Sequence, residues 1–130
     1  MVLTEQQQEL KNTVKALIDA GCNYRLAELE KLYAPELSII MLQPNGKIIS
    51  FDYQQNMDFF RQLRDSGAAP IDKTAEFNYV DVVGQLGYVI VTRKMNLGDG
   101  PKNIVFNLML KKFGELWQVY REHAVIINQT

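Results

Sequence analysis

The second half of the chain carries four long segments of strand-type sequence, at 74–83, 87–97, 102–113 and 116–127. They are separated only by the short stretches GQLG, LGDGP and FGEL, each of which contains glycine. Apolar, β-branched runs bounded by such turn signals are typical of consecutive strands. From Lys73 onward the sequence therefore predicts a long antiparallel meander, and the rest of the chain must pack against it.

The first third of the chain has helical periodicity instead. Thr4 and Gln7 form a capping-box pattern, in which each side chain satisfies a free backbone N–H of the other residue. Gly21 is a natural stop for this helix, and Asn23 could cap a second helix that Pro35 ends. The apolar positions expected on these two helices are Leu10, Val14, Leu17 and Ile18, followed by Leu26, Leu29, Leu32 and Tyr33.

A hairpin and a third helix follow. Two apolar runs flank Asn45-Gly46, a strong hairpin signal because both residues tolerate positive φ. Asp52 and Gln55 repeat the capping-box pattern and open a helix that closes near Gly67. Its apolar stripe is Tyr53, Met57, Phe60 and Leu63. Helices that cover one face of an antiparallel sheet define an α+β fold.

Composition excludes several function classes. The 130 residues are expected to form one domain, 1–130, and 14 basic residues against 15 acidic ones do not suit a nucleic-acid partner. A single cysteine, Cys22, allows no internal disulfide. No apolar run approaches the roughly 20 residues that span a bilayer. We therefore expect a cytoplasmic protein with no nucleic-acid or membrane partner.

The alternation of side chains along each strand predicts which residues point inward. In NIVFNLMLKK, an entirely apolar set should meet the helices: Ile104, Phe106, Leu108 and Leu110. If Gly114-Glu115 is a two-residue turn, Leu110 lies opposite Val119, and the same register places Arg121 opposite Leu108 and His123 opposite Phe106. Opposed residues share a face, so this register predicts that Arg121 and His123 point inward with Trp117.

The strand at 87–97 is apolar on both faces, and we favour Tyr88, Ile90 and Thr92 as its inward set. The opposite face of the sheet then carries Asn107, Met109, Gln118, Tyr120 and Glu122. This mixture suits a sheet-to-sheet homodimer contact. The alternative is a half-exposed sheet face without a partner.

The order helix, short helix, hairpin with a PNG turn, helix and meander resembles the nuclear transport factor 2-like superfamily. This is the cone-shaped, cystatin-like fold of SnoaL-like proteins, ketosteroid isomerase, scytalone dehydratase and limonene epoxide hydrolase, and of the calcium/calmodulin-dependent kinase association domain. The most specific element is LWQVYREH, which is similar to the closing strand of that family. The resemblance implies three helices on a strongly curved, mostly antiparallel sheet, a pocket between them, and dimerisation through the outer sheet face.

The chain departs from the chemistries of that family. The first hairpin has no acid between Glu36 and Asp52 where the steroid isomerases carry a base, and one histidine cannot supply the paired histidines of the dehydratase. No acid could be placed on an inward strand position beside Arg121 to complete the cluster of the epoxide hydrolase. Where the kinase association domain has two inner-strand arginines, this chain has Ile90 and Leu108.

Arg121 and His123 are the candidate catalytic residues. A guanidinium facing inward needs an acceptor, which is either a ligand oxygen or a helix carboxylate such as Asp19, Glu28 or Asp58. His123 is either a general acid/base or a core histidine bonded to a tyrosine or the backbone. The candidate ligand-binding residues, each of which could equally be packing, are Tyr33, Met57, Phe60, Tyr88, Ile90, Phe106, Leu108 and Trp117.

Three functions remain open from the sequence. The first is a domain that binds a small organic molecule, whose carboxylate or carbonyl end would lie on Arg121. The second is an isomerase, dehydratase or cyclase in which His123 moves a proton. The third is a dimeric protein-interaction module with a filled pocket. No cofactor is expected, and one histidine with one cysteine makes no recognised metal site.

Overall fold

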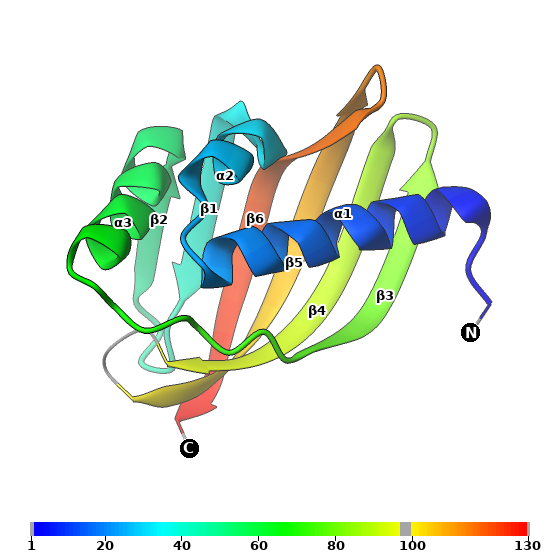
Figure 1. The fold of residues 1–130 in the computed structure, drawn as a ribbon. Helices are drawn as coiled ribbons and strands as arrows, with labels where there is room; N and C mark the ends of the chain where they lie inside the picture. Colours follow the sequence, from blue (N-terminus) through cyan, green and yellow to red (C-terminus); the bar gives the residue numbers. More distant parts are fainter. Residues whose placement is uncertain (1, 97–99, 130) are drawn as a thin grey trace.

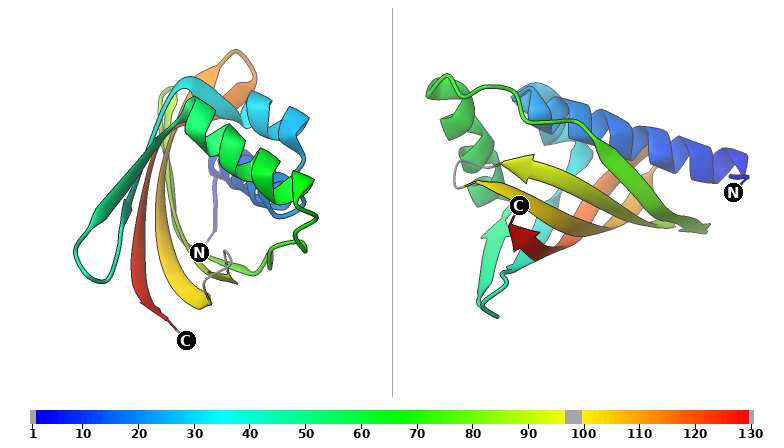
Figure 2. Two further views of the ribbon diagram at one scale, coloured as in Figure 1. Left: turned by 90° about the vertical axis from the view of Figure 1, so that its left-hand side faces the viewer. Right: turned by 90° about the horizontal axis from the view of Figure 1, so that it is seen from below.

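The computed structural model describes residues 2–96 and 100–129, and within these residues it contains three helices and one six-stranded sheet. The helices lie together on one face of the sheet (Figure 1). The sheet curves around them without closing (Figure 2). The elements are α1 (Glu5–Cys22), α2 (Leu26–Leu32), β1 (Tyr33–Leu42), β2 (Ile48–Asp52), α3 (Tyr53–Asp65), β3 (Ala75–Val83), β4 (Leu86–Asn96), β5 (Pro101–Phe113) and β6 (Leu116–Gln129).

The strand order is β2-β1-β6-β5-β4-β3, and β1 with β6 is the parallel pair in an otherwise antiparallel sheet. The α+β class and the mostly antiparallel sheet predicted from the sequence are confirmed. The four strands of the meander lie within two residues of their expected bounds. Residue 97, which was expected to end the second of them, lies outside the described residues.

Both capping boxes are formed. The Gln7 backbone N–H donates to Thr4 Oγ1 at 3.1 Å, and the Thr4 N–H donates to Gln7 Oε1 at 2.9 Å. Asp52 and Gln55 exchange the same two bonds at the start of α3. Each box satisfies two backbone donors that a helix start would otherwise leave free, so the two long helices begin where the sequence predicted.

The expected start and end of α2 are wrong. Asn23 ends α1 instead of capping α2, because its side-chain Nδ2 and backbone N–H both donate to the Asp19 carbonyl, at 2.9 and 3.2 Å. The N-cap position of α2 is Arg25. Tyr33 already belongs to β1, and so does Pro35, which therefore does not end the helix.

The register of the β5–β6 hairpin changes partway along. Leu110 pairs with Val119 as expected, but the next pair is Met109 with Arg121, so Tyr120 is an extra residue in β6. Such a bulge shifts every later side chain to the opposite face. The predicted inward orientation of Arg121 and His123 is therefore wrong, and Glu122, expected on the outer face, is turned inward and lies opposite Leu108.

The face assigned to β4 is also wrong. Its buried residues include Val89 and Val91, at 0% and 1% exposure, and Arg93 follows them at 8%. Tyr88, which was expected inside, lies on the outer face with Ile90 and Thr92, and its hydroxyl donates to Asn107 Oδ1 at 2.9 Å. The packing of these valines under α1 decides which face of β4 points inward. Since the alternation continues along the strand, Arg93 points inward as well.

Candidate functional site

A cavity of about 180 Å³ lies under the helices, between the C-terminal turn of α1, α3 and the concave face of the sheet. Most of its wall is apolar. The lining residues are Leu17, Ile18, Gly21, Cys22, Tyr33, Ile39, Met41, Phe51, Asn56, Phe59, Phe60, Ile71, Val91, Arg93, Met95, Phe106, Leu108 and Glu122. An apolar cavity with a few polar groups is the usual form of a small-molecule site.

Glu122 brings a carboxyl group to this wall from β6. The side chain is 7% exposed, and within the described part of the chain it has no hydrogen bond or ion pair. Burial raises its pKa from the ordinary 4.5 to about 7, while the charge of Arg93 acts in the opposite direction. Burial dominates because a carboxylate loses its hydration inside the protein. Near neutral pH the group is thus divided between acid and carboxylate.

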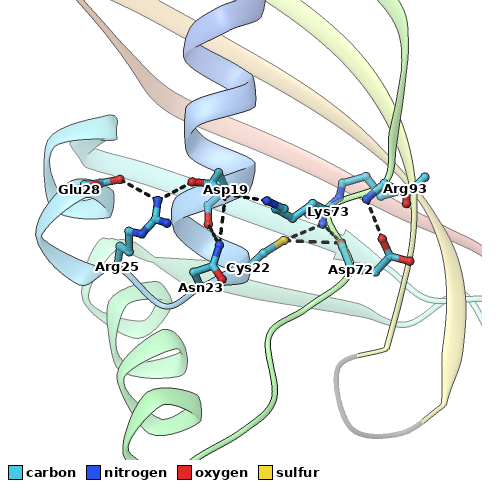
Figure 3. A network of polar contacts seen from close by, with 9 residues as sticks. Asp19, Cys22, Asn23, Arg25, Glu28, Asp72, Lys73 and Arg93 are labelled. Atoms are coloured by element: carbon cyan, nitrogen blue, oxygen red, sulfur yellow. Dashed lines mark hydrogen bonds and ion pairs between the residues drawn. The ribbon is translucent and has the colours of Figure 1, made fainter.

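Arg93 reaches the cavity from β4. One of its terminal nitrogens, Nη2, donates to the Asp72 backbone carbonyl at 2.5 Å and to Cys22 Sγ at 3.0 Å (Figure 3). Its Nε is buried and has no hydrogen-bond partner. A guanidinium stays charged and needs acceptors for its N–H groups, so this arginine is fixed in position but incompletely satisfied.

The segment between α3 and β3 is tied to the end of α1, and this connection forms one wall of the cavity. The Ile71 N–H donates to the Cys22 carbonyl at 3.0 Å, and the Tyr24 hydroxyl donates to the Ala69 carbonyl at 2.7 Å. Asp72 follows Ile71 in the chain, and its backbone carbonyl accepts the hydrogen bond from Arg93 Nη2. These bonds hold Ile71 in the lining. Figure 3 shows Asp72, from the same segment, beside Arg93.

Two further polar side chains line the cavity. Tyr33 lies at the start of β1, and burial followed by the nearby charge of Glu122 raises the pKa of its hydroxyl. Asn56 projects from α3 and is 7% exposed; its Nδ2 has no partner in hydrogen-bond geometry, but Asn56 lies close enough to the Tyr33 hydroxyl to counteract part of the rise in the pKa of Tyr33. A neutral phenol, an amide N–H, a carboxyl and a guanidinium are therefore distributed around an apolar space.

Four of the eight residues expected to bind a ligand line the cavity: Tyr33, Phe60, Phe106 and Leu108. Met57 and Trp117 are both 2% exposed and belong to the core beside it. Tyr88 and Ile90 lie on the outer face. The expected site is thus partly assembled, from β1, α3 and β5.

Arg121 and His123 lie outside the cavity. On the outer face, Arg121 Nε donates to His123 Nε2 at 2.9 Å. The helix carboxylates considered as partners of Arg121 form ion pairs with other residues. Asp19 and Glu28 pair with Arg25, and Asp58 pairs with Arg61. Neither the expected ion pair nor an inward-facing histidine is formed.

The polar residues of the cavity that the sequence analysis missed are Arg93, Glu122, Asn56 and Cys22. For Arg93 the sequence carries a partial signal, because Arg93 shares a strand face with Val89 and Val91, but both faces of β4 are apolar and alternation does not show which one points inward. Glu122 had no such signal, since the bulge at Tyr120 leaves no mark in the alternation of β6. Asn56 lies one position before Met57 on α3, beside its expected apolar stripe.

Comparisons with known proteins support the fold. No protein-family model matches the sequence, and no curated protein is significantly similar to it. Among solved structures, a nuclear transport factor 2-like protein of unknown function from Silicibacter pomeroyi superposes with a TM-score of 0.76. It is 16% identical, and the match covers 98% of this chain and 100% of that one.

Two further neighbours have names that refer to an activity. A candidate dehydratase of the NTF2-like family from Streptomyces avermitilis has a TM-score of 0.69 and 13% identity, covering 95% of this chain and 96% of that one. A ketosteroid isomerase-like protein from Erwinia carotovora atroseptica has a TM-score of 0.67 and 12% identity, covering 97% and 99%. The chain therefore has the nuclear transport factor 2-like fold, as its sequence predicted. One scaffold of this kind hosts many activities.

Proposed function

We propose that this protein binds a small, largely apolar organic molecule that carries a carbonyl or carboxyl oxygen. One observation carries the proposal: the apolar cavity is lined by two side chains, Arg93 and Asn56, that each have a buried N–H group without a partner. Buried donors are almost always hydrogen-bonded in native proteins. A ligand oxygen would supply the missing acceptor, and the apolar wall would hold the rest of the molecule.

The size of the cavity limits the ligand. An engineered protein cavity of about 150 Å³ lined by apolar side chains is large enough to bind benzene. A space of about 180 Å³ suits one aromatic ring, or an aliphatic group of similar volume, with one small polar substituent. Benzaldehyde and benzyl alcohol are therefore suitable first probes.

The test is calorimetric titration of the protein with these probes, using one variant that fills the cavity. Phe60 lines the cavity, and Phe60→Trp should abolish binding because the larger ring occupies the space. Phe113→Trp makes the same change at a residue that is 56% exposed, and binding should persist. Equal binding by the wild-type protein and the Phe60→Trp variant would place the ligand elsewhere and refute the proposal.

A second candidate function is proton transfer, favoured by the raised pKa of Glu122 at the cavity wall. An acid whose pKa lies near the working pH can both take and give a proton. The Asn56 amide and the Tyr33 hydroxyl could donate to the oxygen of an enolate formed from a carbonyl ligand. In this proposal Glu122 takes the acid/base role considered for His123, and the ketosteroid isomerase-like neighbour agrees with such chemistry.

Exchange of α-hydrogens for deuterium in a small ketone, followed by NMR, tests this second function directly. Indan-2-one is a suitable probe because its acidic C–H groups are attached to one ring. The wild-type protein should accelerate exchange, and Glu122→Gln should return the rate to that of buffer. Glu115→Gln, at an exposed position in the β5–β6 turn, is the matched control. Acceleration that survives Glu122→Gln would exclude Glu122 as the base.

A further inference from the structure

We infer that the natural ligand of the cavity is a small monocarboxylate whose anionic group binds Arg93, with an apolar body of about one ring against the opposite wall. The inference rests on the proposed function, since it requires that the cavity be a binding site. It goes further by selecting the anion over the neutral carbonyl compound.

Within the described residues, Arg93 has no carboxylate among its hydrogen-bond acceptors. Its two hydrogen bonds go to a backbone carbonyl and a sulfur atom, and neither acceptor is a carboxylate. No carboxylate forms an ion pair with Arg93 in the part of the chain that the structure describes, although its charge contributes to the lowered pKa of the Asp72 carboxyl group and acts against the raised pKa of Glu122. Burying a charge is costly unless a counter-charge accompanies it. A ligand carboxylate would supply both the charge and the acceptor.

The Arg93 side chain is held in position before any ligand binds. Asp72 and Cys22 fix the guanidinium from the side of the α3–β3 segment, and that segment is itself bonded to the end of α1. The side chain therefore loses little conformational freedom when an anion binds. Preorganised donors convert more of their interaction into affinity, and a guanidinium matches the geometry of a carboxylate.

Glu122 is the carboxyl group on the cavity wall that would repel an anion in its charged form. The other ionisable groups on the cavity wall are Cys22 from α1, Tyr33 from β1 and Arg93 from β4. With its pKa near 7, Glu122 is mostly protonated below neutrality and then offers an O–H donor. A protonated Glu122 therefore tolerates a carboxylate, whereas the charge of Arg93 opposes an amine.

The experiment compares three probes that share one ring and differ in charge: benzoate, benzyl alcohol and benzylamine. Calorimetry at pH 6 should give an affinity for benzoate at least ten times that for benzyl alcohol, and no binding of benzylamine. Arg93→Met should remove the preference for benzoate and retain binding of benzyl alcohol. Arg64→Met, which removes a half-exposed guanidinium on α3, should change neither affinity.

The outcomes separate the two proposals. If benzyl alcohol binds as tightly as benzoate, the inference fails while the proposed binding function stands. If neither probe binds, both fail. Because Arg93→Met removes a buried residue and could unfold the protein, Arg93→Lys provides a second variant that keeps the charge and should keep part of the preference. A benzoate preference that survives in a folded Arg93→Met protein would place the anion site elsewhere and overturn the inference.

Discussion

Arg93 and Glu122 line the same cavity from β4 and β6. The charge of Arg93 and the burial of Glu122 act in opposite directions on the pKa of the Glu122 carboxyl group. The guanidinium favours the carboxylate, but burial favours the neutral acid more strongly and raises the pKa to about 7. In the unfolded chain the same group has its ordinary pKa of 4.5. Between these two values the folded state therefore holds more protons at Glu122 than the unfolded state does.

This difference predicts that the protein loses stability as the pH rises from about 4.5 to about 7. A state that binds more protons is disfavoured by proton removal, so the free energy of unfolding falls through that window and levels off above it. A difference of this size corresponds to about 3 kcal/mol. Urea unfolding of the wild-type protein at pH 5 and pH 8 measures it.

Glu122→Gln should remove this contribution, because the amide does not titrate. Glu115→Gln changes an exposed carboxyl group and should leave the pH dependence as it is in the wild-type protein. If the free energy of unfolding changed equally between pH 5 and pH 8 in the wild-type protein and in Glu122→Gln, the raised pKa of Glu122 would be contradicted.

Benzoate binding should also depend on pH. Benzoate stays anionic across pH 5.5–8.5, whereas Glu122 changes from acid to carboxylate around pH 7. A second negative charge in the cavity repels the ligand, so the dissociation constant should rise about tenfold or more over this range. Calorimetry at four pH values measures the change. The Glu122→Gln variant should bind with little pH dependence, and a constant wild-type affinity would separate Glu122 from the anion site.

Much of the fold follows from local sequence signals. Thr4 with Gln7 and Asp52 with Gln55 mark helix starts that depend only on neighbouring residues, and Asn45-Gly46 forms its turn with Gly46 at φ 85°. These features need no tertiary information. The alternation of β5 likewise identified its buried face.

The site depends on features that local patterns do not carry. The extra residue Tyr120 in β6 exchanges the faces of Arg121 and Glu122, and nothing in LWQVYREH distinguishes a bulged strand from a regular one. In β4 both faces were apolar, so only packing against α1 decided that Arg93 turns inward. A shift of one residue therefore changed the polar groups of the cavity while the fold remained as predicted.

Two glycines should respond to alanine in opposite ways. At Gly87 an added Cβ would lie 2.7 Å from Leu10 Cδ2 and 3.2 Å from Trp117 Cζ3, and both neighbours are buried. Gly87→Ala should therefore lower the free energy of unfolding by about 1–3 kcal/mol. Gly21 lies in the last turn of α1, where a Cβ would make ordinary contact with Phe60 at 3.5 Å.

Gly21→Ala should stabilise the protein by up to about 1 kcal/mol, because alanine restricts the unfolded chain and favours the helix. Urea unfolding of both variants measures the two effects. If Gly87→Ala proved neutral, β4 would lie farther from α1 than the structure has it. A destabilised Gly21→Ala would show that the methyl group does not fit against Phe60.

We predict that the protein forms a homodimer through the outer face of the sheet. Tyr88, Ile90 and Met109 lie half-buried on this face beside Asn107 and the Arg121–His123 pair. Apolar and aromatic groups mixed with hydrogen-bonding ones are typical of a protein interface.

Sedimentation velocity at increasing concentration should reveal a dimer of the wild-type protein. Met109→Glu should give a monomer, because it places an uncompensated charge at the centre of the contact. Val2→Glu adds the same charge at an exposed apolar residue before α1, outside the sheet, and should leave the dimer intact. If both variants dissociate equally, the effect of the added charge is not specific to the sheet face, and the prediction fails. If the wild-type protein remained monomeric at a concentration about 100 times a micromolar dissociation constant, the predicted dimer would be refuted.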